Sequence, residues 1–215
     1  QQMFADLNRY AIRPSKSLSI LYDHRDYTAQ LTKALIAKSP AFRDLVELEK
    51  TSLAPRSRRL FTLSALYHAT AELLADMEDE PQQLAELAVS YWEAVAARLP
   101  EWQRVRLGEL SAGEVRMDYI HTHGVVLQAL GRVGNVLIRR YPQQWPKKLA
   151  ALERIDWRRA NSAQWEGRAL SGGRISKAGQ NVLLTANVIK ARLRLPLTPE
   201  EQAVEEAVSR GTDDE

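Results

Sequence analysis

The sequence contains no cysteine among its 215 residues. This absence excludes disulfide frameworks, cysteine nucleophiles and cysteine-ligated zinc. With only 10 Gly and 9 Pro, the chain is neither collagen-like nor of low complexity. No apolar run is long enough to span a bilayer, and the first residues lack the basic start and apolar middle of a signal peptide. We therefore expect a soluble, cytoplasmic protein with no membrane contact.

The composition is that of a globular protein, with 45% hydrophobic and 27% charged residues. This length suffices for one large domain or two small ones with a buried core. The chain does not begin with Met, and Met3, Phe4 and Leu7 already have helical spacing. We expect the chain to be part of a longer protein.

The charge is unevenly distributed along the chain, although the net charge is only +3. Residues 1–60 carry a net +5, residues 61–114 a net −7 and residues 195–215 a net −6. Residues 115–194 hold 15 Lys and Arg against 4 Asp and Glu, a net +11. Such a block attracts polyanions, with an affinity that depends on salt. Alternatively, these bases pair with the acidic blocks across the fold.

Helical spacing predominates, and strand patterns are scarce. Apolar residues at intervals of three and four predict a helix over 60–77, and Pro81 begins the next one. A helix over about 180–193 has cations in its last turn, where the helix dipole favours them. The sequence therefore predicts a mainly α protein.

Two capping boxes mark further helix starts. Ser111 with Glu114 predicts one long helix as far as Ile138, and Thr198 with Glu201 predicts a last, acidic helix. Three glycines lie inside the predicted long helix, namely Gly124, Gly131 and Gly134. Glycine weakens a helix by roughly 1 kcal/mol, so either another backbone packs closely there or the helix is broken.

Candidate catalytic and metal-binding residues are few. His121 and His123 are the only close histidine pair, and two residues apart on a helix their rings diverge too far to share a metal. The run from Asp23 to Asp26 offers either a general base beside a carboxylate or, as we prefer, a helix start with Asp23 as the N-cap. The acidic run 76–80 lacks the glycine and spacing of a metal loop and fits a solvated helix junction. No phosphate loop or nucleophile motif is present, so we expect no enzyme, cofactor or metal.

The basic block also contains aromatic residues, because Trp157 and Trp165 alternate with arginines. Arginine beside the turn Ser171-Gly172-Gly173 suits phosphate contact, since guanidinium and backbone N–H groups both donate. Alternatively, the tryptophans fill the core and the arginines are solvated. The candidate DNA-binding residues are Arg13, Lys16, Arg154, Arg158, Arg159, Arg168, Arg174, Lys177, Lys190, Arg192 and Arg194.

Two segments of the sequence resemble a known family. The opening QQMFADLNRYAIRPSKSLSILYDHRD resembles the closing part of the DGQHR domain. The segment IDWRRANSAQWEGRALSGGRISKAGQNVLLTANVIKARLRLPLTPEE resembles the C-terminal region of the DndB family of DNA sulfur modification proteins. The pentapeptide DGQHR itself is absent. The resemblance assigns Gln2, Phe4, Asp6 and Asn8 to a structural segment of the family, and 165–168 to a family signature.

The resemblance implies the C-terminal part of a larger α+β protein whose β-containing part, related to the ParB/sulfiredoxin class, lies upstream. Residues 1–25 would end the DGQHR-like domain, and 26–215 would form a helical domain with its basic region at 115–194. The family implies a repressor that binds promoter DNA of the bacterial phosphorothioation genes, and a homo-oligomer is compatible with this role. Two alternatives remain: a helical DNA-positioning or assembly domain of a nucleotide-dependent or nucleolytic enzyme, and a protein-binding module that uses 61–114.

Overall fold

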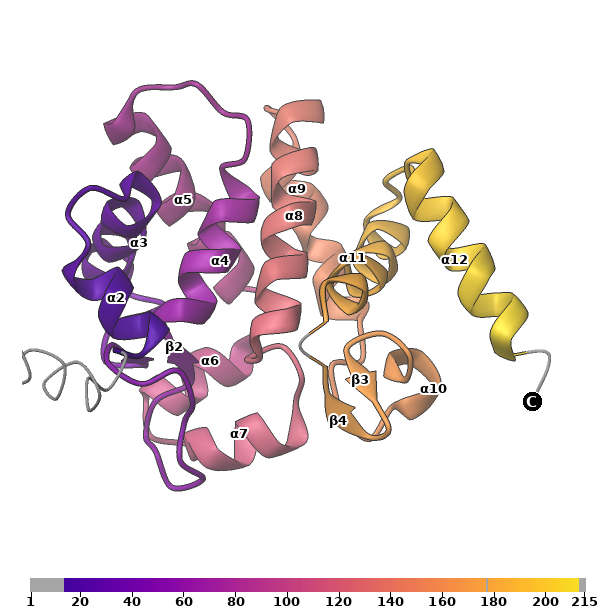
Figure 1. Ribbon diagram of the computed structural model, residues 1–215, viewed down its shortest axis with the longest axis horizontal. Helices are drawn as coiled ribbons and strands as arrows, with labels where there is room; N and C mark the ends of the chain where they lie inside the picture. Colours follow the sequence, from indigo (N-terminus) through magenta and orange to yellow (C-terminus); the bar gives the residue numbers. More distant parts are fainter. Residues whose placement is uncertain (1–13, 177, 213–215) are drawn as a thin grey trace, which may run out of the picture.

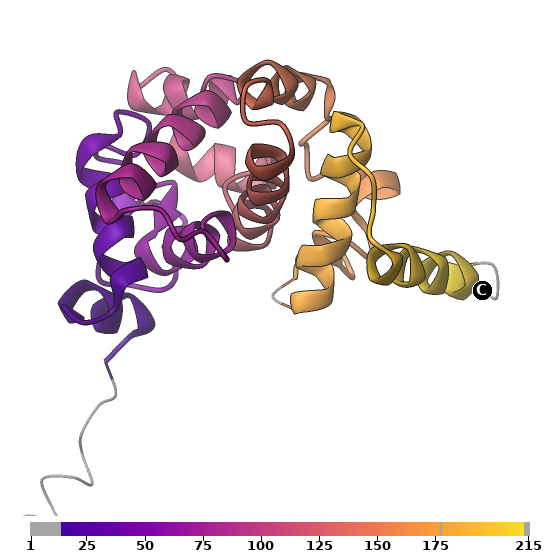
Figure 2. The same ribbon diagram turned by 90° about the horizontal axis from the view of Figure 1, so that it is seen from above.

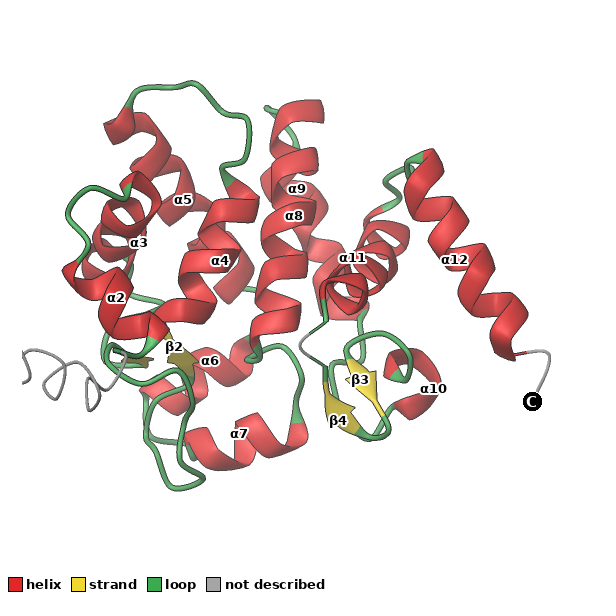
Figure 3. Cartoon of the chain, in the orientation of Figure 1, coloured by secondary structure: helices red, strands yellow, loops and turns green. Residues whose placement is uncertain are grey.

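Two adjacent helices, α4 (Leu63–Leu73) and α8 (Gly124–Arg140), form the centre of the molecule (Figure 1). The computed structural model describes residues 14–176 and 178–212. A Cβ atom at Gly131 would lie 2.2 Å from the carbonyl oxygen of Ala69, and one at Gly134 would collide with Tyr91. Gly131 is therefore the close backbone approach that the sequence indicated, whereas Gly134 makes room for the side chains of Tyr91 and Leu73. Figure 3 shows that the described chain is mainly α, as predicted.

The N-terminal helices pack on one side of α4. Asp26 begins α3, because its carboxylate oxygen Oδ1 accepts the N–H of Ala29 at 3.0 Å. The expectation that Asp23 is the N-cap was wrong: Asp23 ends α2, and its carboxylate accepts the N–H groups of Arg25 and Asp26. The helices on this side are α2 (Lys16–Tyr22), α3 (Tyr27–Lys38) and α5 (Pro81–Ala96).

The predicted long helix from Ser111 is broken into two helices. Its capping box is present and begins α7 (Ala112–Asp118). At Tyr119 the backbone becomes extended, because Tyr119 bridges to Arg158 and the next N–H donates to the Trp157 carbonyl at 3.0 Å. The chain resumes as a helix only at α8, so the prediction of one continuous helix was wrong.

One aromatic cluster anchors the core beneath α5 and α6 (Pro100–Arg106). The Phe61 ring meets Trp102 edge-on with centroids 4.8 Å apart, and Phe42 contacts both Phe61 and Trp92. Phe61 lies in a short parallel pair of strands, β1 (Val46–Glu47) and β2 (Phe61–Thr62). Ile20 of α2 belongs to the same core. The predicted domain boundary at residue 25 stays a prediction.

The C-terminal part of the chain packs on the other side of α8. Helix α11 (Gly179–Leu193) contacts α8, and α12 (Pro199–Thr212) packs on α11 at the end of the molecule farthest from α2 and α3 (Figure 2). The predicted second capping box is confirmed, since Thr198 and Glu201 bond reciprocally. The shorter elements are α9 (Trp145–Lys148), the 3-10 helix η1 (Leu149–Arg154), α10 (Ser162–Trp165), β3 (Leu170–Ser171) and β4 (Arg174–Ile175).

The acidic run 76–80 connects α4 to α5, where most of its side chains are exposed, as expected of a solvated junction. Within the described ranges, no helix is both long and apolar enough to cross a bilayer.

Candidate nucleic-acid interface

The two tryptophans of the basic segment belong to the core. Their rings stack with centroids 5.6 Å apart at 12°, and both side chains are buried. The indole N–H of Trp165 donates to the Asp156 carbonyl at 2.8 Å, and that of Trp157 to Leu152 at 3.1 Å. Because both rings are buried, a nucleobase cannot stack on them. Their indole hydrogen bonds instead fix the backbone next to Arg158 and Arg159.

A tight hairpin, β3–β4, lies beside α10, the short helix that ends at Trp165 (Figure 1). Gly172 and Gly173 form its turn with φ values of 56° and 69°, the left-handed conformation that suits glycine in a two-residue hairpin. Both turn N–H groups donate to the Glu166 carboxylate. The predicted exposed turn is confirmed, but the expected donation of its N–H groups to phosphate is contradicted, since Glu166 already occupies them.

We call three arginines the arginine face: Arg174, which lies in β4, and Arg158 and Arg159, which line a hollow together with Leu170 and Gly173 of the hairpin. The guanidinium of Arg159 donates to the carbonyl of Gly173 at 2.7 Å, which ties the loop after Trp157 to the hairpin tip. Arg174 is exposed and has no ion-pair partner among the described residues. The arginine face therefore combines arginines from two segments, the loop after Trp157 and strand β4.

Arg158 is partly neutralised, because its guanidinium donates to both carboxylate oxygens of Asp156 at 2.9 and 2.8 Å. This contact lowers the pKa of Asp156 below its ordinary value. An exposed pair of this kind adds little stability, so a phosphate can compete for the guanidinium at small cost.

Arg168, which we expected to contact phosphate, is occupied within the protein. Its guanidinium donates to both carboxylate oxygens of Glu205 at 2.7 Å and to the Leu184 carbonyl at 3.1 Å. The Arg168 charge holds the pKa of Glu205 below its usual range. We correct its role: Arg168 fastens α12 to the rest of the chain.

Lys190 is contradicted as a DNA contact. Its side chain is only 2% exposed, and its ammonium lies 2.6 Å from both carboxylate oxygens of Glu201. A buried, paired ammonium cannot reach a phosphate, because desolvation and the ion pair hold it inside. The alternative that bases pair with the acidic blocks is therefore correct for Lys190 and Arg168.

The remaining predicted contacts are scattered. Arg154, Arg192 and Arg194 are exposed and have no ion-pair partner in the part of the chain that the structure describes. Lys16 lies apart from them at the edge of a cavity near α4. Arg13 and Lys177, together with the family segment from Gln2 to Asn8, fall outside the described residues.

A second cationic group, which is not among the predicted contacts, lies at the end of α8. The ammonium of Lys148 lies 4.3 Å from the centroid of the Tyr141 ring, and the Arg140 guanidinium lies 5.9 Å from the same ring. Arg139 and Lys147 are exposed nearby in the sequence. The run RRYPQQWPKK is the signal that indicates this group.

The histidine pair lies between α7 and α8, not on a helix as expected. His121 is buried and accepts the indole N–H of Trp102 at 3.0 Å through Nδ1, which leaves the ring proton on Nε2, facing Glu101. His123 Nε2 bonds to the Arg116 carbonyl. The two rings thus have separate partners. Within the described ranges, no group of three or more His, Asp or Glu has the arrangement of a metal site.

The fold and this surface define a helical protein with a cationic hairpin. The chain belongs to the DndB family, described as DNA-sulfur modification-associated, whose family model matches residues 1–196. Membership connects the chain with DNA sulfur modification. No curated protein and no solved structure matches the sequence.

Proposed function

We propose that this chain is a non-enzymatic, DNA-binding transcriptional repressor of the gene cluster for DNA phosphorothioation. Its partner is double-stranded promoter DNA. The single observation that best supports DNA contact is the contact between the Arg159 guanidinium and the Gly173 carbonyl, which holds the arginine-bearing loop after Trp157 against the hairpin that carries Arg174. The family supplies the connection with DNA sulfur modification.

The arginine face suits backbone contact better than base readout. Arg158 and Arg174 are exposed at a hairpin whose turn already binds one carboxylate, that of Glu166, through backbone N–H groups. Guanidinium groups form bidentate bonds to phosphate oxygens and so fix the register of a protein on the duplex. The tryptophans and Asn181 add no base contact, because the amide of Asn181 donates to the Gly167 and Arg168 carbonyls.

The test is a repression assay with a reporter gene under the promoter of a phosphorothioation cluster. The full chain should lower reporter expression, and Arg158→Ala with Arg174→Ala should relieve the repression. Arg43→Ala is the matched control, because Arg43 is an exposed arginine outside the arginine face. Purified protein should retard the same promoter fragment in a gel.

The alternative enzyme role predicts a different result. Turnover of nucleotides, or cleavage of DNA with added Mg²⁺, by the purified chain without any repression would contradict the proposal. If the double variant still represses the reporter as wild type does, the DNA contact lies outside the arginine face.

A further inference from the structure

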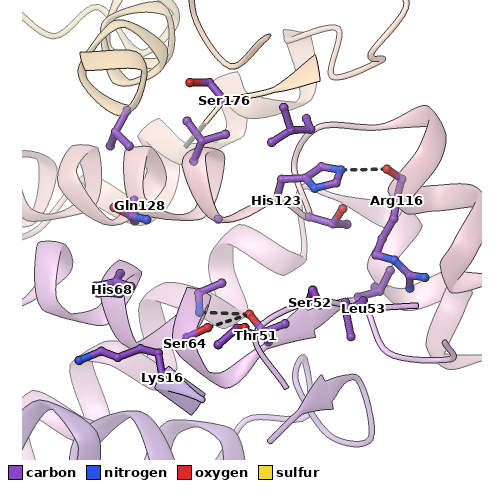
Figure 4. A pocket seen from close by; sticks show the side chains of 18 residues that line it. Lys16, Thr51, Ser52, Leu53, Ser64, His68, Arg116, His123, Gln128 and Ser176 are labelled. Atoms are coloured by element: carbon purple, nitrogen blue, oxygen red, sulfur yellow. Dashed lines mark hydrogen bonds between the residues drawn. The ribbon is translucent and has the colours of Figure 1, made fainter. Parts of the chain in front are cut away.

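A cavity of about 560 Å³ lies between α2, α4, the N-terminus of α8 and Ser176, the residue that follows β4 (Figure 4). Ser64 and His68 of α4 form one wall, and Ser176 lies on the opposite one. This volume is in the range of small-molecule sites. The cavity is separate from the arginine face, and the proposed function does not use it.

The charged side chains that line the cavity are basic. Lys16 and Arg116 line it, and none of its lining residues is Asp or Glu. The Arg116 guanidinium donates to backbone carbonyls of 54–59, so no carboxylate neutralises it. The Lys16 ammonium lies 5.4 Å from the centroid of the Tyr67 ring, and it forms no ion pair within the described residues. The cavity therefore has a positive potential.

The N-terminus of α8 adds hydrogen-bond donors. His123 is the N-cap and supplies no side-chain cap, and the N–H groups of Gly124 and Val125 have no acceptor within the described residues. Both residues line the cavity. Because α8 is 17 residues long, its dipole places a partial positive charge at this end.

A buried hydroxyl provides independent support for a ligand. Thr122 is only 4% exposed, lines the cavity, and its Oγ1 has no hydrogen-bond partner in the described chain. A buried polar atom without a partner costs about 1–3 kcal/mol. An occupant with acceptor oxygens would satisfy the hydroxyl and the two N–H groups at once.

We propose that this cavity binds the phosphate group of a small molecule. The Thr122 hydroxyl and the first N–H groups of α8 donate to the phosphate oxygens, and Lys16, at the other edge of the cavity, attracts the anion (Figure 4). Leu53, Val125 and Ile175 give the cavity an apolar wall against which an organic part of the ligand packs. Thr122 and Val125 are each 4% exposed, too deep for a phosphate within a duplex backbone. The occupant is therefore a small phosphorylated compound and not DNA.

The test is isothermal titration calorimetry of the full chain with inorganic phosphate at constant ionic strength, with chloride as the reference anion. Phosphate should bind saturably. Thr122→Val, which keeps the side-chain shape, and Lys16→Gln should each weaken binding at least fivefold. Lys38→Gln is the matched control, because Lys38 is an exposed lysine outside the cavity, and it should bind as wild type.

Three outcomes would overturn the proposal. The first is phosphate behaving as chloride does. The second is wild-type affinity in both Thr122→Val and Lys16→Gln; Lys16 is exposed, so its variant folds even where the Thr122 variant does not. The third is displacement of phosphate by duplex DNA with loss of DNA affinity in Thr122→Val, which would assign the cavity to a backbone phosphate.

Discussion

Lys190 and Glu201 form a buried ion pair that joins α12 to α11. The ammonium lies 2.6 Å from both carboxylate oxygens, and the two side chains are 2% and 3% exposed. Glu201 also accepts the N–H of Thr198, so one carboxylate both caps α12 and neutralises the Lys190 ammonium of α11. Glu201 thus holds the start of α12, while Glu205 holds its middle through Arg168.

Glu201→Gln should detach α12 from α11. The substitution leaves a buried ammonium without its counter-ion, which costs about 3–5 kcal/mol. Because α12 packs mainly on α11, the loss should be local. Hydrogen exchange should show faster exchange of the α12 amides, while the amides of α4 and α8 stay protected. Glu200→Gln on the exposed side of α12 is the control, and equal α12 protection in both variants would refute this role of the ion pair.

Gly131→Ala should destabilise the central helix pair. The new Cβ would lie 2.2 Å from the Ala69 carbonyl oxygen, so α4 and α8 must move apart. We expect a loss of about 2–3 kcal/mol in the free energy of unfolding, measured in urea. Gly179→Ala is the control: nothing lies within 4 Å of its Cβ position, and Ala at this helix start should leave stability equal or higher. A harmless Gly131→Ala would disprove the close approach.

Local signals in the sequence predicted the helix starts, and long-range contacts account for the rest. The capping boxes at Ser111 and Thr198 and the proline at 81 each act within one turn, so the sequence displays them directly. The break at Tyr119 arises from a bridge to Arg158, which no local pattern indicates. The helical prediction therefore failed there.

The same distinction applies to the candidate site. The pair Gly172-Gly173 predicted the hairpin turn, and this turn places Arg174 in β4 and accepts the contact from Arg159. The partner of Arg168, by contrast, lies 37 residues away on α12. Periodicity and composition do not indicate which cation a distant helix will cover. The sequence therefore predicted DNA contacts for Arg168 and Lys190, although both pair with carboxylates of α12.

Stability should fall as the pH drops below 7, because burial lowers the pKa of His121. In the unfolded chain this histidine has a pKa near 6.5 and is protonated below that pH, whereas in the folded chain it stays neutral. The neutral, buried His121 therefore contributes its full stabilisation above the unfolded-state pKa and loses it as the pH falls below that pKa. We expect the free energy of unfolding to decrease by about 1 kcal/mol between pH 7 and 5.5. Urea unfolding at both pH values checks this.

The matched variants are His121→Asn and His24→Gln. His24 is exposed, so its variant should keep the full pH dependence. His121→Asn should be less stable at pH 7 but lose less on acidification. The interpretation fails if both variants lose the same free energy.

Glu166→Gln should strengthen DNA binding. The Glu166 carboxylate is held by the turn N–H groups of Gly172 and Gly173, next to the arginine face, and repels phosphate there. A glutamine keeps one acceptor oxygen for the turn without the charge. We expect a gain of about 0.5–1 kcal/mol, the size of an exposed charge interaction, measured by fluorescence anisotropy with labelled duplex. Weaker binding in this variant would show that the turn conformation outweighs the charge.

The salt dependence of duplex binding tests the central claim most directly. Log Kd should rise linearly with log salt, with a slope of about 0.9 per contacted phosphate. Arg158→Ala with Arg174→Ala should weaken binding and reduce this slope by about 2, whereas Arg43→Ala should leave both unchanged. Circular dichroism melting confirms that each variant is folded. A wild-type slope near zero, or a double variant with the wild-type slope, would contradict DNA binding through the arginine face.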